Sequence, residues 1–244
     1  MAPRTLVIAL GASVVAAACT ESTGPPLDDQ LQPQQEQYEQ LTAPDGTLRG
    51  VRWAPGDGAP EFEIVAGEDD EGAGELGLGV VAAPQSGPPR LDRYEVSFWA
   101  VRGRHRSIQI NYVTDRGLRP FLRFTVPRWA LHRRADGTRI RRGEAVLITI
   151  TVHRERLRAD FEPSGLQFSR WRPAVLRVWY GGADWDFDGD GVVDEQDEQL
   201  KSRLRLWFQD EPGADWYTLP SYHSRRGEWI AAWMPHFTGT QVSY

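Results

Sequence analysis

The chain has 244 residues, with 28 Lys and Arg against 34 Asp and Glu, and it contains 24 Gly, 17 Pro and 10 Trp. This composition favours strands and turns over long helices, and the single cysteine, Cys19, excludes an intramolecular disulfide framework. The positive charge is almost entirely Arg, which we interpret as a compositional bias, and we expect no nucleic-acid partner.

The first 18 residues have the organisation of a bacterial export signal. Arg4 precedes an apolar run over residues 6–18, which is too short for a convincing transmembrane helix. Three alanines then lead into Cys19, and this junction resembles the lipobox of bacterial lipoproteins, in which the cysteine is acylated and becomes the mature N-terminus. The resemblance implies a signal peptide over residues 1–18 and a membrane anchor on Cys19. The outer membrane is favoured because Thr20 stands where Asp would indicate inner-membrane retention. An ordinary signal peptide cut before Cys19 is the alternative, and it also exports the protein.

The next two segments lack the apolar residues of a core. Residues 19–60 begin with a Gln-rich polar stretch and predict a disordered linker that lifts the following domain off the membrane. Residues 61–90 stay acidic and rich in Gly and Pro, and they predict an irregular segment with one or two edge strands. Between residues 91 and 172, by contrast, eighteen Arg face eight acidic residues. This basic centre fits a polyanion such as lipopolysaccharide, but we prefer neutralisation by the acidic flanks of the same chain.

From residue 91 onward, apolar and polar residues alternate with the period of two that is typical of half-buried strands. The segments 94–101 and 107–113 flank the turn-like sequence RGRHR and predict a β-hairpin. Further strands are predicted at 120–127, 144–152, 172–180, 204–210, 215–220, 228–235 and 238–244. Short strands at this spacing predict a mainly β fold, an antiparallel β-sandwich over residues 91–244.

The order of several short motifs resembles the ZU-five domain, the β-sandwich of zonula-occludens proteins, ankyrins and netrin receptors. A strand ending in a Pro turn, a P-x-G-x-x-F stretch leading to P-A-x-L, and a late H-F-S are the motifs of that family. Here they match Val126, Pro127, Ala130 and Leu131, then Pro163, Gly165, Phe168, Pro173, Ala174 and Leu176, then His236 and Phe237 with Thr238 in the serine position. The resemblance implies an interaction or anchoring module rather than an enzyme.

The Asp-rich stretch DWDFDGDGVVDEQDEQL has the spacing of a calcium loop. Ca²⁺ takes six to eight oxygen ligands, and a twelve-residue loop supplies them from positions 1, 3, 5, 7, 9 and 12, with Gly at position 6. These positions hold Asp186, Asp188, Asp190, the backbone carbonyl of Val192, Asp194 and Asp197, with Gly191 at the sixth. The sequence therefore predicts a Ca²⁺ site over residues 186–197. An acidic, solvated, metal-free loop is the alternative.

The loop resembles those of dockerins more than those of sensor EF-hands, because Asp rather than Glu occupies its twelfth position. Dockerins carry two such loops, whereas this chain has one, and the residues before Asp186 predict a strand and a turn instead of an entering helix. We therefore interpret the loop as a calcium staple inserted between two strands of the sandwich, and a short helix can follow it.

The tripeptide at His236, Phe237 and Thr238 raises a second possibility. Some ZU-five domains cleave themselves before the Ser or Thr of a similar tripeptide by an N-to-O acyl shift. By that resemblance, the Thr238 hydroxyl would be the nucleophile and His236 the base. The alternative is that His236 only donates or accepts a hydrogen bond within the sandwich while Phe237 fills the core.

Other chemistry is not indicated by the sequence. The remaining histidines show no metal-ligand spacing, and the chain has no Gly-rich phosphate loop, no G-x-S-x-G motif and no cysteine nucleophile, so we expect no enzyme. The Trp residues of strand-like runs are predicted to be core. Those in turn-rich surroundings are the predicted surface candidates, namely Trp53, Trp171, Trp185 and Trp216.

These observations together favour a non-catalytic, calcium-binding lipoprotein of the cell envelope. Its expected role is that of a surface interaction or scaffold module, with an unidentified protein or glycan as partner. A carbohydrate- or polyanion-binding module that uses exposed Trp and Arg is the first alternative, and a domain that cleaves itself before Thr238 is the second.

Overall fold

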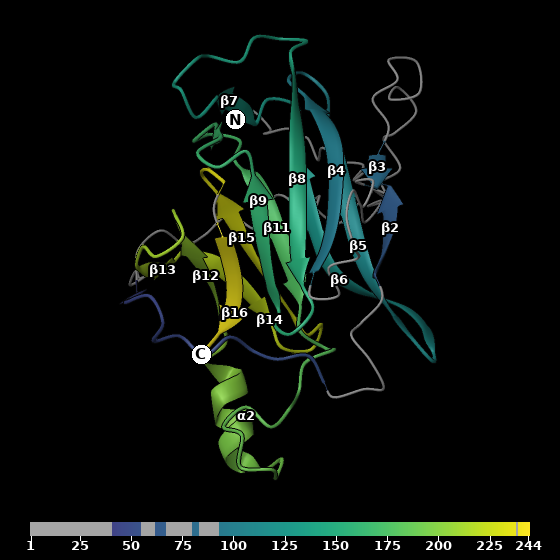
Figure 1. Cartoon of the computed structure of the whole chain (residues 1–244), viewed down its shortest axis with the longest axis vertical. Helices are drawn as coiled ribbons and strands as arrows, with labels where there is room; N and C mark the ends of the chain where they lie inside the picture. The colour runs from purple at the N-terminus through teal and green to yellow at the C-terminus, as the bar shows by residue number, and fades with distance from the viewer. Residues whose placement is uncertain (1–40, 55–61, 67–79, 83–92, 238) are drawn as a thin grey trace, which may run out of the picture. The chain divides into compact units, whose positions relative to one another are not determined.

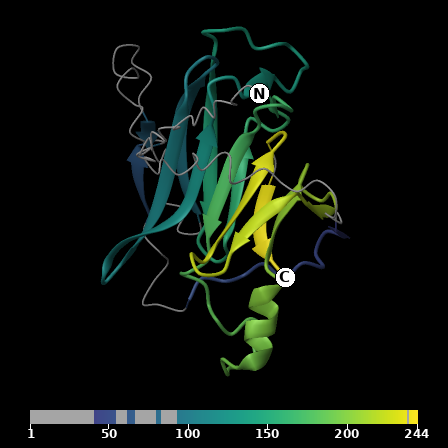
Figure 2. The same ribbon diagram turned by 180° about the vertical axis from the view of Figure 1, so that it is seen from behind.

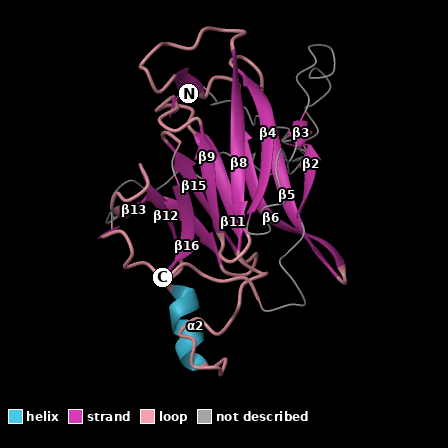
Figure 3. Ribbon diagram, viewed as in Figure 1, coloured by secondary structure: helices cyan, strands magenta, loops and turns pink. Residues whose placement is uncertain are grey.

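The computed structural model describes residues 41–54, 62–66, 80–82, 93–237 and 239–244. All of them fall in one compact unit, which consists mainly of antiparallel strands (Figures 1 and 3). Two large sheets stack face to face, and the predicted mainly β, antiparallel sandwich is therefore confirmed.

The first sheet has eight strands. In spatial order they are β1 (Thr42–Ala43), β13 (Trp216–Thr218), β12 (Arg205–Gln209), β16 (Gly239–Ser243), β9 (Arg158–Glu162), β8 (Ala145–His153), β4 (Arg93–Val101) and β3 (Val80–Ala82). The longest pairing within this sheet joins β4 and β8 over nine residue pairs, from Arg93 opposite His153 to Val101 opposite Ala145. Strand β16 near the C-terminus lies inside this sheet, between β12 and β9.

The second sheet has six strands. Their spatial order is β14 (Ser221–Ser224), β15 (Trp229–Met234), β11 (Ala174–Trp179), β6 (Gly117–Val126), β5 (Arg106–Thr114) and β2 (Phe62–Ala66). A small separate pair joins β7 (Leu131–Arg133) to β10 (Gln167–Phe168), and the helix α2 spans Glu195–Ser202. Figure 2 shows the assembly from behind, with β5 and β6 continuing into a projecting hairpin.

The core between the sheets is built on phenylalanine. Phe124 of β6 is fully buried, and its ring centroid lies 5.3 Å from that of Phe161 on β9 and 6.4 Å from that of Phe98 on β4. Phe168 and Phe237 complete the cluster, at 6.2 and 5.5 Å from Phe124. Because these rings come from both sheets, burial of the cluster holds the two layers together.

The predicted hairpin of residues 94–101 and 107–113 is wrong. Strand β4 pairs with β8 and β3 in one sheet, whereas β5 pairs with β6 and β2 in the other. The segment between β4 and β5 therefore carries the chain across the sandwich, and Gly103 within it has a φ of +104° that favours glycine. The hairpin of this region is β5–β6, which closes through the two residues between Thr114 and Gly117.

The predicted linker also ends earlier than expected. Within residues 19–60, the described part contains β1, which pairs with β13 far along the chain. Val51 and Trp53 are 3% and 8% exposed and belong to the core. Residues 41–54 are therefore part of the domain, because β1 extends the eight-stranded sheet and the side chains of Val51 and Trp53 pack in the core. Strands β2 and β3 lie in the segment 61–90, where one or two edge strands were expected.

Candidate metal centre

The predicted calcium loop, residues 186–197, connects β11 to β12 and runs into α2. Helix α2 begins at Glu195, the tenth position of the loop, so the short helix allowed by the sequence is present. Asp194 caps it, because its carboxylate accepts a hydrogen bond from the N–H of Gln196 at 2.7 Å. Acidic residues at Glu195, Asp197 and Glu198 suit the positive end of the helix dipole.

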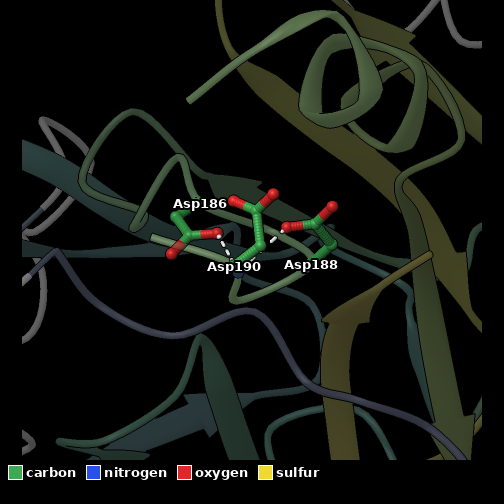
Figure 4. Close-up of side chains that lie close together, drawn as sticks. All are labelled: Asp186, Asp188 and Asp190. Carbon is green, nitrogen blue, oxygen red and sulfur yellow. Dashed lines mark hydrogen bonds between the residues drawn. The ribbon is translucent and has the colours of Figure 1, made fainter. Parts of the chain in front are cut away.

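Three aspartates of the loop converge (Figure 4). Asp186, Asp188 and Asp190 each offer a carboxylate oxygen within 4.8 Å of the others, and among the described residues they are the group that could hold a metal ion. Asp186 also organises the backbone, because it accepts hydrogen bonds from the N–H groups of Gly189, Asp190 and Gly191 at 2.8, 3.1 and 2.9 Å. Gly191, at the sixth position, has a φ of +89°, which is the sharp turn that the loop requires.

The other predicted ligands lie outside this group of three. Asp194 serves as the helix cap, and Asp197 is directed at backbone amides. Val192 is 58% exposed, and the role of its carbonyl stays a prediction. Three of the six predicted ligand residues thus lie close together, while Asp194 and Asp197 form hydrogen bonds to backbone amides, and the metal site itself stays a prediction.

Asp197 closes the loop. Its side chain is almost completely buried, and one oxygen accepts hydrogen bonds from the N–H groups of Phe187 at 2.6 Å and Asp188 at 3.4 Å. The other oxygen accepts from the N–H of Asp194 at 3.0 Å. The hydrogen bond from Asp194 lowers the pKa of Asp197 most strongly, and those from Phe187 and Asp188 add to this against the opposing effect of burial. A charged carboxylate therefore joins the two ends of the loop.

Crowding of charge has the opposite effect on Asp188. The N–H of Asp190 lowers its pKa, but burial and the carboxylates of Asp190, Asp197 and Asp186 together raise the pKa above its ordinary value. Negative charges held this close repel one another. A divalent cation between them would remove that repulsion, which is the electrostatic reason for predicting a metal in this loop.

Aromatic contacts fix the loop to the sandwich. Phe187, the second loop residue, is 8% exposed, and its carbonyl accepts a 2.6 Å hydrogen bond from the hydroxyl of Tyr244 after β16. The ring of Phe187 packs edge-on against Tyr244 and Trp185, with centroids 6.2 and 5.9 Å away. On its other side, Trp185 carries the ammonium of Lys201 from α2 at 4.0 Å from its ring centroid. The loop is therefore attached to the core on its second residue, not only at its ends.

A cleft of about 560 Å³ opens beside the loop. Asp184, Asp186 and Asp188 contribute to its lining, and so do Arg49 and Arg156 from other segments. The cleft gives an ion access from solvent to two of the three converging aspartates, and the arginines moderate the negative potential around them.

The tripeptide at His236 is only partly described, because Thr238 lies outside the described residues. His236 Nδ1 lies 3.4 Å from the carbonyl oxygen of Phe237, and its Nε2 lies 3.6 Å from an oxygen of Asp210 and 3.4 Å from the Tyr217 hydroxyl. Phe237 is fully buried in the phenylalanine cluster. Phe237 thus fills the core, as one alternative for this tripeptide expected, and the role of Thr238 stays a prediction.

Two of the four predicted surface tryptophans are buried. Trp53 is 8% exposed and Trp216 is 3% exposed. Burial of each indole N–H is tolerated because it donates a hydrogen bond, from Trp53 to the carbonyl of His153 and from Trp216 to the carboxylate of Asp45. Trp171 is 92% exposed, as predicted.

The prediction also fails for four of the five tryptophans that were expected to be core, since only Trp207 is buried. Trp99 is partly exposed on the eight-stranded sheet, and Trp179, Trp229 and Trp233 are partly exposed on the outer face of the six-stranded sheet. The sequence indicated the exposure of Trp179, because this residue lies two positions after Arg177 in the same strand. Residues two apart in a strand point to the same face of the sheet, and a charged Arg side chain favours the face in contact with solvent.

Cys19, the predicted signal peptide and residues 20–40 of the linker lie outside the described residues, so the lipid anchor stays a prediction. Within the described part of the chain, no helix is long and apolar enough to cross a bilayer. No family model, no curated protein and no solved structure matches this chain.

Proposed function

We propose that this protein is a non-catalytic, calcium-binding module of the cell envelope that presents a β-sandwich as an interaction or scaffold surface. The observation that carries the proposal is the loop of residues 186–197. Its first, third and fifth residues converge, its sixth is a glycine in a left-handed turn, and its second is buried against the sandwich. This combination supports a structural cation over an unspecialised acidic surface. Calcium titration of the purified chain tests it, and absence of binding would overturn it.

Calcium is the cation that the donor set fits best. All predicted donors are oxygens, and a flexible set of carboxylates and one carbonyl suits Ca²⁺ better than Zn²⁺, which prefers nitrogen and sulfur. Asp186, Asp188 and Asp190 would hold the ion, with Val192, Asp194 and Asp197 as the further predicted ligands. When bound, the cation neutralises the clustered carboxylates. The chain's own residues fix the loop to the core through Phe187 and Tyr244.

The resemblance to the ZU-five domain supports the interaction role, as does the mainly β sandwich that the resemblance implies. Fold alone does not establish function. The proposal therefore depends on the loop and on export, and not on the sandwich by itself.

The proposed lipid anchor is tested by the substitution Cys19→Ser. Without the thiol no acyl chain can be attached, and we expect the protein to move from the membrane pellet to the soluble envelope fraction on ultracentrifugation. The double variant Asp188→Ala/Asp190→Ala is the matched control and should stay in the pellet. Unchanged membrane association of Cys19→Ser would refute the lipid anchor.

The non-catalytic reading is tested by intact mass under denaturing conditions. We expect a single species whose C-terminal residues 238–244 remain covalently attached, because Phe237 has a packing role that explains its place. Loss of that seven-residue peptide would establish the self-cleaving alternative instead. Thr238→Ala should then restore the full mass.

A further inference from the structure

The outer face of the six-stranded sheet carries a patch of aromatic and cationic side chains. On β11 and β15, every second residue points into the core, and the residues between them point outward. The outward set on these strands and their neighbours β14 and β6 forms what we call the outer platform, defined by Trp179, Trp229, Trp233, Tyr222, Arg177 and Arg123. All six side chains are partly or fully exposed.

Strand register makes the platform continuous. Trp179 lies directly opposite Trp229, and Arg177 lies opposite Ala231, the small residue between Trp229 and Trp233 on β15. Trp229 and Trp233 are four residues apart and about 13 Å along the strand, so their indoles lie on the same face with Ala231 between them. The ring of Tyr222, which is 51% exposed, extends the surface, with its centroid 5.2 Å from that of Trp229 and an interplanar angle of 37°.

The charge of the platform is positive, and neither of its arginines forms an ion pair with a carboxylate of the described residues. The Arg177 guanidinium lies 4.1 Å from the ring centroid of Trp229 and 5.5 Å from that of Trp179. Arg123 lies opposite Arg177 on β6, and its guanidinium donates to the amide oxygen of Gln109 at 3.0 and 2.6 Å. Strands β14, β15, β11 and β6 contain no acidic residue. Like charges on facing strand positions repel, and an anionic ligand would relieve that repulsion.

Polar groups are mixed with aliphatic ones around the rings. Ser224 stands opposite Trp229. The partly exposed Val175 stands opposite Trp233, and Thr125 and Ser107 continue this row across β6 and β5. Serine is depleted at the centres of protein–protein interfaces, where rings are packed into apolar surroundings. Flat indole faces beside hydroxyls and guanidinium groups are suited instead to a ligand with ring-shaped apolar faces, many hydroxyls and carboxylates.

We propose that the outer platform binds an acidic polysaccharide, with a sugar ring stacked on Trp233 and the uronate carboxylates paired with Arg177 and Arg123. Guanidinium groups bind carboxylates by two parallel hydrogen bonds, which gives such contacts both strength and orientation. The inference deepens the proposed interaction role by naming the partner class, and it rests on that role. It does not depend on calcium, because no platform residue belongs to the loop.

The test uses the mature full-length chain carrying Cys19→Ser, with polygalacturonate as the probe in buffer containing EDTA. Affinity electrophoresis and tryptophan fluorescence should report binding to polygalacturonate that weakens as NaCl is raised, and no comparable binding to neutral dextran. Arg123→Gln/Arg177→Gln should weaken binding at least about tenfold, since two charge-assisted contacts are lost. Trp233→Ser should weaken it by a similar factor without removing charge.

Two variants serve as matched controls. Arg116→Gln removes an exposed arginine at the tip of the β5–β6 hairpin, and Trp171→Ala removes an exposed tryptophan outside the platform. Both should bind as the parent chain does. Three results would each overturn the inference: no binding to polygalacturonate, equal binding to dextran, or equal binding to polyglutamate, which has the carboxylates without the sugar rings. Because the assay contains no calcium, its outcome is separable from failure of the metal site.

Discussion

Millimolar CaCl₂ is expected to raise the melting temperature of the purified domain by roughly 5–10 °C. A ligand that binds only the folded state stabilises it in proportion to the logarithm of its concentration over Kd, and a domain of this size shifts by a few degrees per kcal/mol. Asp188→Ala/Asp190→Ala should abolish the rise, because it leaves one of the three converging carboxylates. Differential scanning fluorimetry in CaCl₂ and in EDTA measures the melting temperatures of the unmodified chain and of the double variant.

The control for this experiment is a pair of exposed acidic residues away from the loop. Glu211→Ala/Asp215→Ala removes the same charge between β12 and β13 and should retain the full calcium response. Asp197→Ala tests the closure of the loop independently of the metal. It removes the acceptor of three backbone hydrogen bonds and should therefore lower the melting temperature even in EDTA, where no metal is bound. Absence of a calcium response in the unmodified chain would contradict the metal assignment.

Phe124→Ala is expected to be among the most destabilising substitutions in the domain. Its ring is fully buried and packs against four other phenylalanine rings, two of which lie on the opposite, eight-stranded sheet, so truncation leaves a cavity between the layers. Such changes cost about 3–5 kcal/mol, a large fraction of the ~5–15 kcal/mol by which a domain is stable. Guanidinium chloride unfolding, followed by tryptophan fluorescence, should show a much lower midpoint.

Trp171→Ala is the comparison for Phe124→Ala, because it removes a larger ring that is 92% exposed. Its midpoint should stay close to that of the unmodified chain, within the range of surface substitutions of about 0.5 kcal/mol. If both variants unfolded at the same denaturant concentration, the phenylalanine cluster would not be the structural centre of the sandwich.

The strands were predictable where one face is buried and the other is polar. Segment 144–152 became β8 (Ala145–His153) and segment 228–235 became β15 (Trp229–Met234), each within a residue or so of the expected limits. Period-two alternation sufficed there, because burial on one side imposes it. Alternation does not say which strand pairs with which, and so β4 and β5 were placed in one hairpin although they belong to different sheets.

Long-range contacts account for most of what the sequence did not reveal. The burial of Trp53 depends on Tyr112 and Phe121, whose rings lie 5.3 and 4.8 Å away but far along the chain. Within the loop, the closeness of the three aspartates could be expected from their spacing alone, because successive ligands of such a loop are near neighbours in the sequence. The burial of Asp197 did not, since it depends on the loop folding back on its own helix.

Strand β16 follows every other strand in the chain, and yet two neighbours enclose it, β12 and β9. Until it is in place, β1, β13 and β12 have no hydrogen-bonded connection to the rest of their sheet, and Tyr244 cannot reach the carbonyl of Phe187. Ribosomes and export channels release a chain from its N-terminus to its C-terminus. The eight-stranded sheet consequently cannot be completed until residues 239–243 have been released, whichever of the two machines holds them.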